Sequence, residues 1–345
     1  MNKQCTITVL LLKAFFVLFT LSFITSCESN RFDVDISGKD IKFTAERFDR
    51  DFTKFKNENY SEVNTYLKNK YPTFHPLYLT NIMALGHPKD PATEKQINLF
   101  LNNSDIASLY DSVLNAFPEI DYIEQDLKKA FTYYHYWFPE KHIPKVVTFM
   151  GAFNYTVAVS DSVLGIGLEN YLGQGFSLYK EVGLPLYKIK KMEPEYLVYD
   201  AMRGWLLSEF SDPDKQDFLL ASILEFGKAL YLMDAMFPNR PDYLKIGFQE
   251  KELQWCLENE HHIWQSMMNS DMLFSRDKNA LKKYTGEAPF TPGMPEESPG
   301  RVGNWVGWQI IKSFAKNNPD MTPQQIIELT DYKSILSKSK YKPKK

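Results

Sequence analysis

The sequence has little of what would place it in several large classes of protein. No apolar run after Ile24 approaches the 18 residues that a transmembrane helix needs. Positive charge is not in excess either. Without residues 1–26, which hold Lys3 and Lys13 and no acid, the chain has 38 basic and 43 acidic residues, a net charge of −5. Because such a chain has no general attraction for a phosphate backbone, we expect no nucleic-acid partner.

Common motifs for phosphate, nucleotide and zinc binding are also missing. There is no phosphate-binding loop, and Gly165-x-Gly167 lacks the third glycine of a dinucleotide-binding turn. No two of the six histidines have the i, i+4 spacing that lets one helix present two imidazoles to zinc. The neighbours His261 and His262 diverge by about 100° in a helix. We therefore predict no metal site and no cofactor.

The N-terminal segment carries the clearest signal that is present. Ala14–Ile24 is an apolar run of 11 residues, preceded by Lys3 and Lys13 and followed by Thr25-Ser26-Cys27. The run is too short to span a bilayer, and small residues precede the cysteine. This pattern resembles the lipobox of bacterial lipoproteins, in which a peptidase cleaves before the cysteine. The resemblance implies lipidation at Cys27, and two or more acyl chains hold a protein on membrane lipid.

Cysteine is scarce, and the lipobox accounts for most of it. Of three cysteines, Cys5 would leave with the signal and Cys27 would carry the lipid. Only Cys256 would remain, so an intramolecular disulfide is excluded in the mature chain. Cys256 lies between Trp255 and Leu257, which favours a small buried side chain over a nucleophile.

Hydrophobic periodicity predicts an α+β fold that is predominantly helical, with a small, mostly antiparallel sheet. Alternation predicts a hairpin of residues 32–36 and 41–43. The expected strands are Lys145–Met150, Tyr155–Val159 and Val163–Leu168. The expected helical regions are Ser61–Phe138, where Glu119–Phe138 has the clearest apolar face, and then Glu195–Phe210, Asp214–Phe237, Gln249–Asn269 and Val302–Asn317. An ordered loop or lid is expected at Thr285–Gly300. The predicted organisation is a signal peptide (1–26), a lipidated polar leader (27–31), one globular domain (32–337) and a Lys-rich tail (338–345).

Two of the predicted helices contain glycines that suggest close packing. Gly227 costs its helix up to about 1 kcal/mol relative to alanine, which favours close approach of another segment. Gly303 and Gly307 are four residues apart beside Trp305 and Trp308, and tight core packing is the preferred interpretation, with a partner helix as the alternative.

Several blocks together resemble the GldB family of gliding-motility lipoproteins. Besides the lipobox, they are Val163–Gly173, Leu224–Asp234 and Pro299–Trp308, in the order in which the family has them. The resemblance implies a membrane-anchored, non-enzymatic accessory protein that supports the motility and secretion apparatus of the cell envelope.

The order of sheet, long helix and downstream glutamate also resembles a degenerate zincin metalloprotease. In those enzymes the central helix carries H-E-x-x-H, and here the matching run Leu224–Lys228 keeps only the glutamate. The resemblance implies a pseudo-active site in which the Lys228 ammonium takes the place of the metal, facing Glu225 and Glu260. No catalytic residue is predicted.

Three functions remain open at this point. The first is a non-catalytic accessory or scaffold for gliding, with protein partners in that apparatus. The second is a zincin-type peptidase or hydrolase, and the third is an envelope lipoprotein that binds a peptide or glycan. Residues 28–31 lack the acidic cluster typical of surface-exported lipoproteins, so we expect a body that faces the periplasm.

Overall fold

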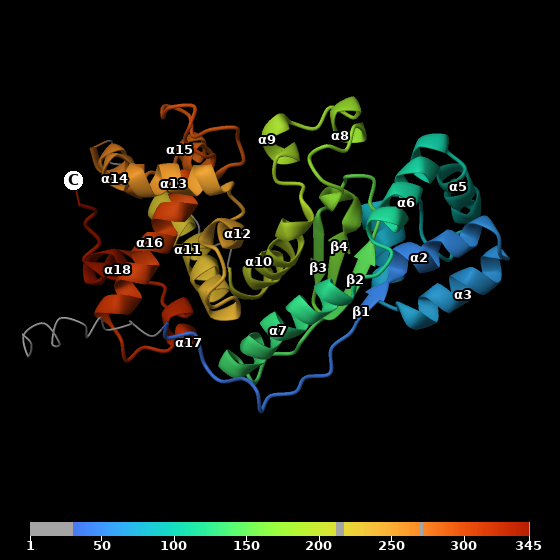
Figure 1. The fold of residues 1–345 in the computed structure, drawn as a ribbon, viewed down its shortest axis with the longest axis horizontal. Coiled ribbons are helices and arrows are strands. Elements are labelled where there is room, and N and C mark those ends of the chain that lie inside the picture. The colour runs from blue at the N-terminus through green and yellow to red at the C-terminus, as the bar shows by residue number, and fades with distance from the viewer. Residues whose placement is uncertain (1–29, 212–216, 270–271, 345) are drawn as a thin grey trace, which may run out of the picture. The chain divides into compact units, whose positions relative to one another are not determined.

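The computed structural model describes residues 30–211, 217–269 and 272–344 (Figure 1). Within these residues one sheet has the strand order β1-β2-β4-β3. The pairs β1–β2 and β2–β4 are parallel, and β3–β4 is antiparallel. The strands are β1 (Ala45–Arg47), β2 (Lys145–Phe149), β3 (Val157–Ser160) and β4 (Val163–Gly167).

Two predictions about strands are wrong. The hairpin of residues 32–36 and 41–43 does not form, and the N-terminal strand is instead β1, which pairs with β2 about 100 residues later in the chain. The sheet is mixed, because two of its three pairings are parallel. Local alternation could indicate strands but could not identify a partner so distant in sequence. The three predicted valine-rich strands are confirmed, with shifted ends.

The N-terminal half of the chain surrounds this sheet with short helices and one long one. They are α2 (Phe48–Phe52), η1 (Thr53–Lys56), α3 (Tyr60–Lys70), α4 (Phe74–Leu77), η2 (Tyr78–Ile82), α5 (Ala92–Leu101), α6 (Ser104–Ala116) and α7 (Asp121–Trp137). Asparagines begin two of them, because the side chains of Asn59 and Asn103 accept hydrogen bonds from backbone N–H groups in the first turns of α3 and α6.

In the described part of the chain, the regular elements after the sheet are all helices. Its elements are η3 (Leu168–Tyr171), α8 (Leu178–Glu181), α9 (Leu186–Ile189), η4 (Pro194–Tyr196), α10 (Leu197–Phe210), α11 (Leu219–Met236), α12 (Asp242–Ile246), α13 (Glu250–Glu258), α14 (Glu260–Asn269), η6 (Met272–Phe274), α15 (Lys278–Thr285), α16 (Val302–Asn317), α17 (Pro323–Ile327) and α18 (Tyr332–Ser339). The predicted helices and the predominantly helical α+β class are confirmed, and residues 286–300 form a loop as expected.

Helices cover both faces of the sheet. Val157 lies opposite Ile166 and packs against Gly204 of α10, where an added Cβ would be 2.9 Å from the valine side chain. Gly165 lies next to Ile166, so it faces the other side, where its position is crowded by Phe74 and Phe149. The rings of Phe74 and Phe149 are 5.6 Å apart. The sheet is thus enclosed between α10 and an aromatic cluster of the N-terminal helices.

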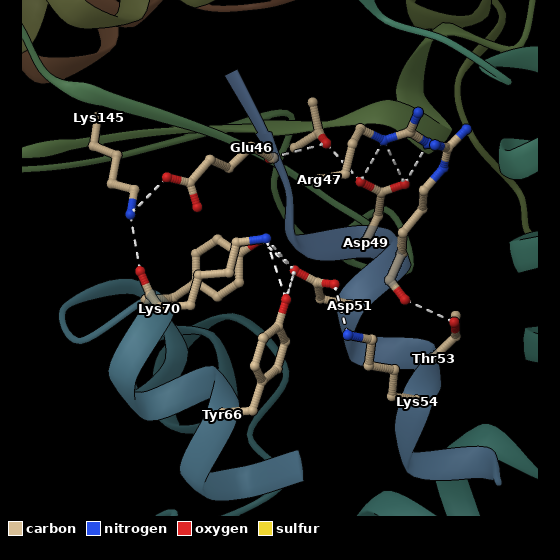
Figure 2. Close-up of polar contacts among 12 residues, drawn as sticks. Glu46, Arg47, Asp49, Asp51, Thr53, Lys54, Tyr66, Lys70 and Lys145 are labelled. Atoms are coloured by element: carbon tan, nitrogen blue, oxygen red, sulfur yellow. Dashed lines mark hydrogen bonds and ion pairs between the residues drawn. The ribbon is translucent and has the colours of Figure 1, made fainter. Parts of the chain in front are cut away.

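A polar network anchors β1 to its surroundings (Figure 2). Arg47 binds Asp49 with two guanidinium nitrogens, and Thr148 of β2 donates to the same carboxylate at 2.5 Å. Asp51 accepts from Lys70 at 2.7 Å and from Tyr66 at 3.0 Å. Burial alone would raise the pKa of Asp51, but hydrogen bonds from lysine and tyrosine, with the lysine charge, outweigh it and lower that pKa.

The core of the C-terminal half is the contact between α11 and α16. A Cβ added at Gly307 would lie 1.8 Å from the carbonyl oxygen of Ile223, and one at Gly227 would lie 2.4 Å from the carbonyl carbon of Gly307. Gly303 meets the backbone of Tyr284 in the same way. The prediction of close approach at Gly227 and of tight core packing at the two later glycines is confirmed.

Two further features bear on the sequence predictions. Cys256 is fully buried in α13, as predicted, and burial raises the pKa of its thiol. The segment expected as a Lys-rich tail contains the end of α18, and Tyr341 contacts Trp264 at a ring distance of 5.1 Å. None of the helices in the described ranges combines the length and apolar character of a membrane span.

Candidate functional site

Glu225 and Lys228 form a buried ion pair on α11. Both are more than 95% buried, and the Lys228 Nζ lies 2.5 Å from Glu225 Oε1. The ammonium also donates to the Leu329 carbonyl oxygen at 2.6 Å, and the Tyr332 hydroxyl donates to Glu225 Oε1 at 3.0 Å. The pair therefore binds the segment between α17 and α18 to the central helix.

The other predicted positions lie elsewhere. Glu260 begins α14, where its Oε1 accepts a hydrogen bond from the Tyr341 hydroxyl at 2.8 Å. It does not line the recess of about 330 Å³ into which Glu225 and Lys228 open. Cys27, the predicted lipidation site, lies outside the described residues.

The histidines are dispersed. His75 is buried, its Nε2 lies 2.8 Å from Asn64 Oδ1, and burial lowers the pKa of its ring to about 4. The rings of His261 and His262 are 5.8 Å apart at their centroids. Among the residues that the structure describes, no three His, Cys, Asp or Glu side chains are grouped as a metal site would require.

The strongest candidate site is a cleft of about 380 Å³ beside the antiparallel edge of the sheet. Its walls include the turn before β3 with the first residue of β3, η3 after β4, parts of α9 and α10, and the residue just before α16. In the view of Figure 1, α8 and α9 lie above β3 and β4, and α10 lies next to β3. We call this the edge cleft.

Two arginines from distant parts of the chain meet in the edge cleft. Arg203 of α10 donates to the Lys245 carbonyl oxygen at 3.0 Å and forms an ion pair with Asp200, one turn earlier. Arg301, just before α16, lies 3.0 Å from Glu287 and donates to the Gly247 carbonyl oxygen at 3.3 Å. A Cβ at Gly247 would be 2.9 Å from the Arg203 guanidinium, so this glycine separates the two cations.

The charges of the edge cleft are largely paired, with one exception. Asp200 also accepts from the Tyr171 hydroxyl at 3.1 Å, and Lys191 lies 3.1 Å from Glu252. Burial lowers the pKa of Arg301. The negative charge of Glu287 opposes this shift, and the positive charge of Arg203 adds to it.

The charge balance of the edge cleft is positive. Four cationic and two anionic side chains line the cleft, and of these cations Lys188 has no ion-pair partner among the described residues. The recess is therefore locally positive.

Two residues of the edge cleft have left-handed backbone conformations. Phe153 has φ of +65° and Arg301 has φ of +61°. For residues other than glycine this conformation costs on the order of 1 kcal/mol or more.

The comparisons with known proteins give one match. A family model described as gliding motility protein GldB matches residues 29–343. The chain belongs to this GldB family. No curated protein and no solved structure matches, so the comparison with zincin metalloproteases has no support.

The edge cleft of this GldB-family protein joins two of the blocks that carried the family resemblance. Asn170 and Tyr171 come from the block Val163–Gly173, and Arg301 comes from the block Pro299–Trp308. Sequence reasoning did not single out these residues. The available signal was an arginine between glycines before a helix, together with Asp200 and Arg203 at i, i+3, and neither pattern indicates a cleft by itself.

Proposed function

We propose that this GldB-family protein is a lipid-anchored, non-catalytic accessory protein of the gliding apparatus. It supports the motility and secretion machinery of the envelope through contacts with other proteins. The observation that carries this proposal is the family match over residues 29–343. Acylated Cys27 would hold the body on the membrane, facing the periplasm.

The use of charge in the core supports a role without catalysis. Glu225 and Lys228 bind each other and the C-terminal segment through Leu329 and Tyr332. In the edge cleft, Asp200 is paired with Arg203, and Glu287 with Arg301. Carboxylates bound in this way position neighbouring chain segments, which suits a structural or binding role.

Colony spreading of a deletion strain tests this function. Loss of the gene should abolish spreading, and the wild-type gene should restore it. A gene with Glu225→Gln should also restore spreading at temperatures where the variant stays folded. The amide oxygen still accepts from Lys228 and Tyr332, although the Lys228 charge is then uncompensated. Normal spreading of the deletion strain would contradict the role in gliding. Lost spreading with Glu225→Gln at an unchanged melting temperature would contradict the non-catalytic role.

The edge cleft favours a second function, that of an envelope protein that binds a peptide or glycan. Its volume and its mixture of aromatic and cationic side chains are typical of ligand sites. This function is compatible with the first, because the bound ligand can belong to a partner in the apparatus. A pull-down with the tethered body would identify such a partner.

A further inference from the structure

We propose that the edge cleft binds an extended, acidic peptide segment of a partner protein. The peptide main chain pairs with the free edge of β3, and a carboxylate of the peptide binds Lys188, Arg203 and Arg301. The inference deepens the proposed function and rests on it for the assignment of the partner to the gliding apparatus.

The free edge of β3 provides the main-chain groups. Within the described residues β3 pairs with β4 alone. The Thr156 carbonyl oxygen accepts from the Gly167 N–H at 2.9 Å, so alternate residues from Thr156 onward point their backbone groups toward β4. The N–H and C=O groups of Val157 and Val159 therefore point to the opposite side. Thr156 and Val157 also line the edge cleft, so a strand added there would run into it.

The cations supply the preference for an acid. Lys188 is exposed at the cleft and has no ion-pair partner in the described part of the chain. Two guanidinium nitrogens of each arginine form hydrogen bonds or ion pairs. The third nitrogen, Nε of Arg203 and Nη1 of Arg301, has no partner among the described residues. The cleft thus offers an anionic group one unpaired charge, that of Lys188, and two N–H donors from the arginines. In a chain with a net charge of −3, this local excess of positive charge selects an anionic ligand.

Apolar groups beside the cations favour a peptide over a small anion. Phe153 and Leu184 line the cleft and pack on the small apolar cluster of Tyr179, Ile189 and Met192. The left-handed backbone at Phe153 is held by its N–H, which donates to Glu169 Oε1 at 3.1 Å. These side chains offer contacts to alternate side chains of an extended peptide, which inorganic phosphate cannot use.

Binding of defined peptides to the full chain in detergent tests the proposal. The probes are fluorescent eight-residue peptides of alternating Thr and Val, with one Glu placed at each position in turn. The best Glu peptide should bind about tenfold or more tightly than its Gln counterpart, because a charge-assisted contact is lost. Two N-methylated versions of the peptide, one modified at odd and one at even positions, should differ. The version whose methyl groups replace the N–H groups that face β3 should not bind. The amides of Val157 and Val159 should exchange hydrogen more slowly in the complex.

Two exposed lysines provide a matched pair of variants. Lys188→Gln should weaken binding of the Glu peptide about tenfold and leave the Gln peptide unaffected. Lys190→Gln removes the same charge two residues away, outside the cleft, and should bind as the wild type does. Both variants should melt at the wild-type temperature, since neither lysine is buried.

Several results would overturn the proposal. These are equal binding of the Glu and Gln peptides, equal effects of the two lysine variants, or no binding by any peptide of the set. Displacement of the peptide by inorganic phosphate or glucuronic acid at the same concentration would assign the cleft to small anions or glycans instead. All of these results leave the spreading assay unchanged, so failure of this inference is distinguishable from failure of the proposed function.

Discussion

At the scale of single residues, buried charges have the largest expected effects on the stability of this molecule. Glu225 and Lys228 lie in the core, each with a second partner from the C-terminal segment. Removing one member of such a pair leaves the other charge in a medium that solvates it poorly. Replacing both leaves no uncompensated charge, so the double variant should be more stable than either single variant.

Lys228→Ala should lower the free energy of unfolding by about 3–5 kcal/mol, because it leaves the Glu225 carboxylate uncompensated. The double variant Glu225→Leu with Lys228→Met should recover much of this loss. Urea unfolding measures both. Lys251→Ala, at an exposed position of α13, is the control and should change stability by less than about 0.5 kcal/mol. A single variant as stable as this control would show that the pair does not brace the core.

Glu169 should make stability depend on pH. Its Oε1 accepts from the Gly151 N–H at 2.9 Å, its Oε2 is buried without a partner among the described residues, and burial raises its pKa to about 7. A carboxyl group whose pKa is higher in the folded than in the unfolded state stabilises the fold fully below the unfolded pKa of 4.5. That contribution is lost as the pH rises through about 7.

Glu169→Gln removes this titration and keeps an acceptor for the Gly151 N–H. Between pH 5 and pH 8 the variant should gain about 2 to 3 kcal/mol of unfolding free energy relative to the wild type. Chemical unfolding at the two pH values measures the difference. Glu296→Gln, at an exposed position of the loop before α16, should show no such gain. A constant difference between Glu169→Gln and the wild type would contradict the raised pKa.

The contact between α11 and α16 is the critical one at the scale of elements. The two helices approach until backbone meets backbone, with Gly307 under the Ile223 carbonyl and Gly227 beside Gly307. Because Gly227 and Gly307 have no side chains, the two helices lie close together, and Trp305 and Trp308 of α16 are fully buried. Separation of the helices by one methyl group would therefore loosen a large part of the core.

Gly307→Ala should destabilise the protein by about 3 kcal/mol or more, because the new Cβ meets a main-chain carbonyl that cannot rotate away. Gly175→Ala is the control, since a Cβ there meets nothing within 4 Å and its φ is not in the left-handed region. Thermal unfolding of both variants compares them. Equal melting temperatures would mean that the two helices are not held at this distance in solution.

The predicted lipid anchor at Cys27 acts at the scale of the whole molecule. No helix in the described ranges is suited to cross a membrane, and the predicted anchor Cys27 precedes the family match at residue 29. Cys27→Ser should release the body from the membrane fraction or leave the precursor unprocessed, and spreading should fail. Cell fractionation and a spreading assay measure this, with Cys256→Ala as the control for loss of a thiol. Membrane retention together with normal spreading of the Cys27 variant would contradict the anchor.

Much of this fold could be read from the sequence because its signals are local. The 3.6-residue periodicity of α7 and α10, the valine runs of β2 to β4 and the prolines of the loop before α16 each depend on neighbouring residues. The glycines of α11 and α16 indicated close packing because a glycine inside a helix is less stable than alanine, and close approach of another segment explains its presence. Of the three residues of the predicted pseudo-active site, the structure brings Glu225 and Lys228 together and leaves Glu260 apart.

Only the tertiary structure decided which distant segments meet. Parallel pairing of β1 with β2, the position of Glu260 beside Tyr341, and the meeting of Arg203 with Arg301 across Gly247 all depend on contacts between segments tens of residues apart. No periodicity encodes such contacts, because they result from the packing of complete helices and strands around a common core. The sequence by itself indicated most of the helices, three of the four strands of the described sheet and the candidate anchor. The packing of those elements created the edge cleft.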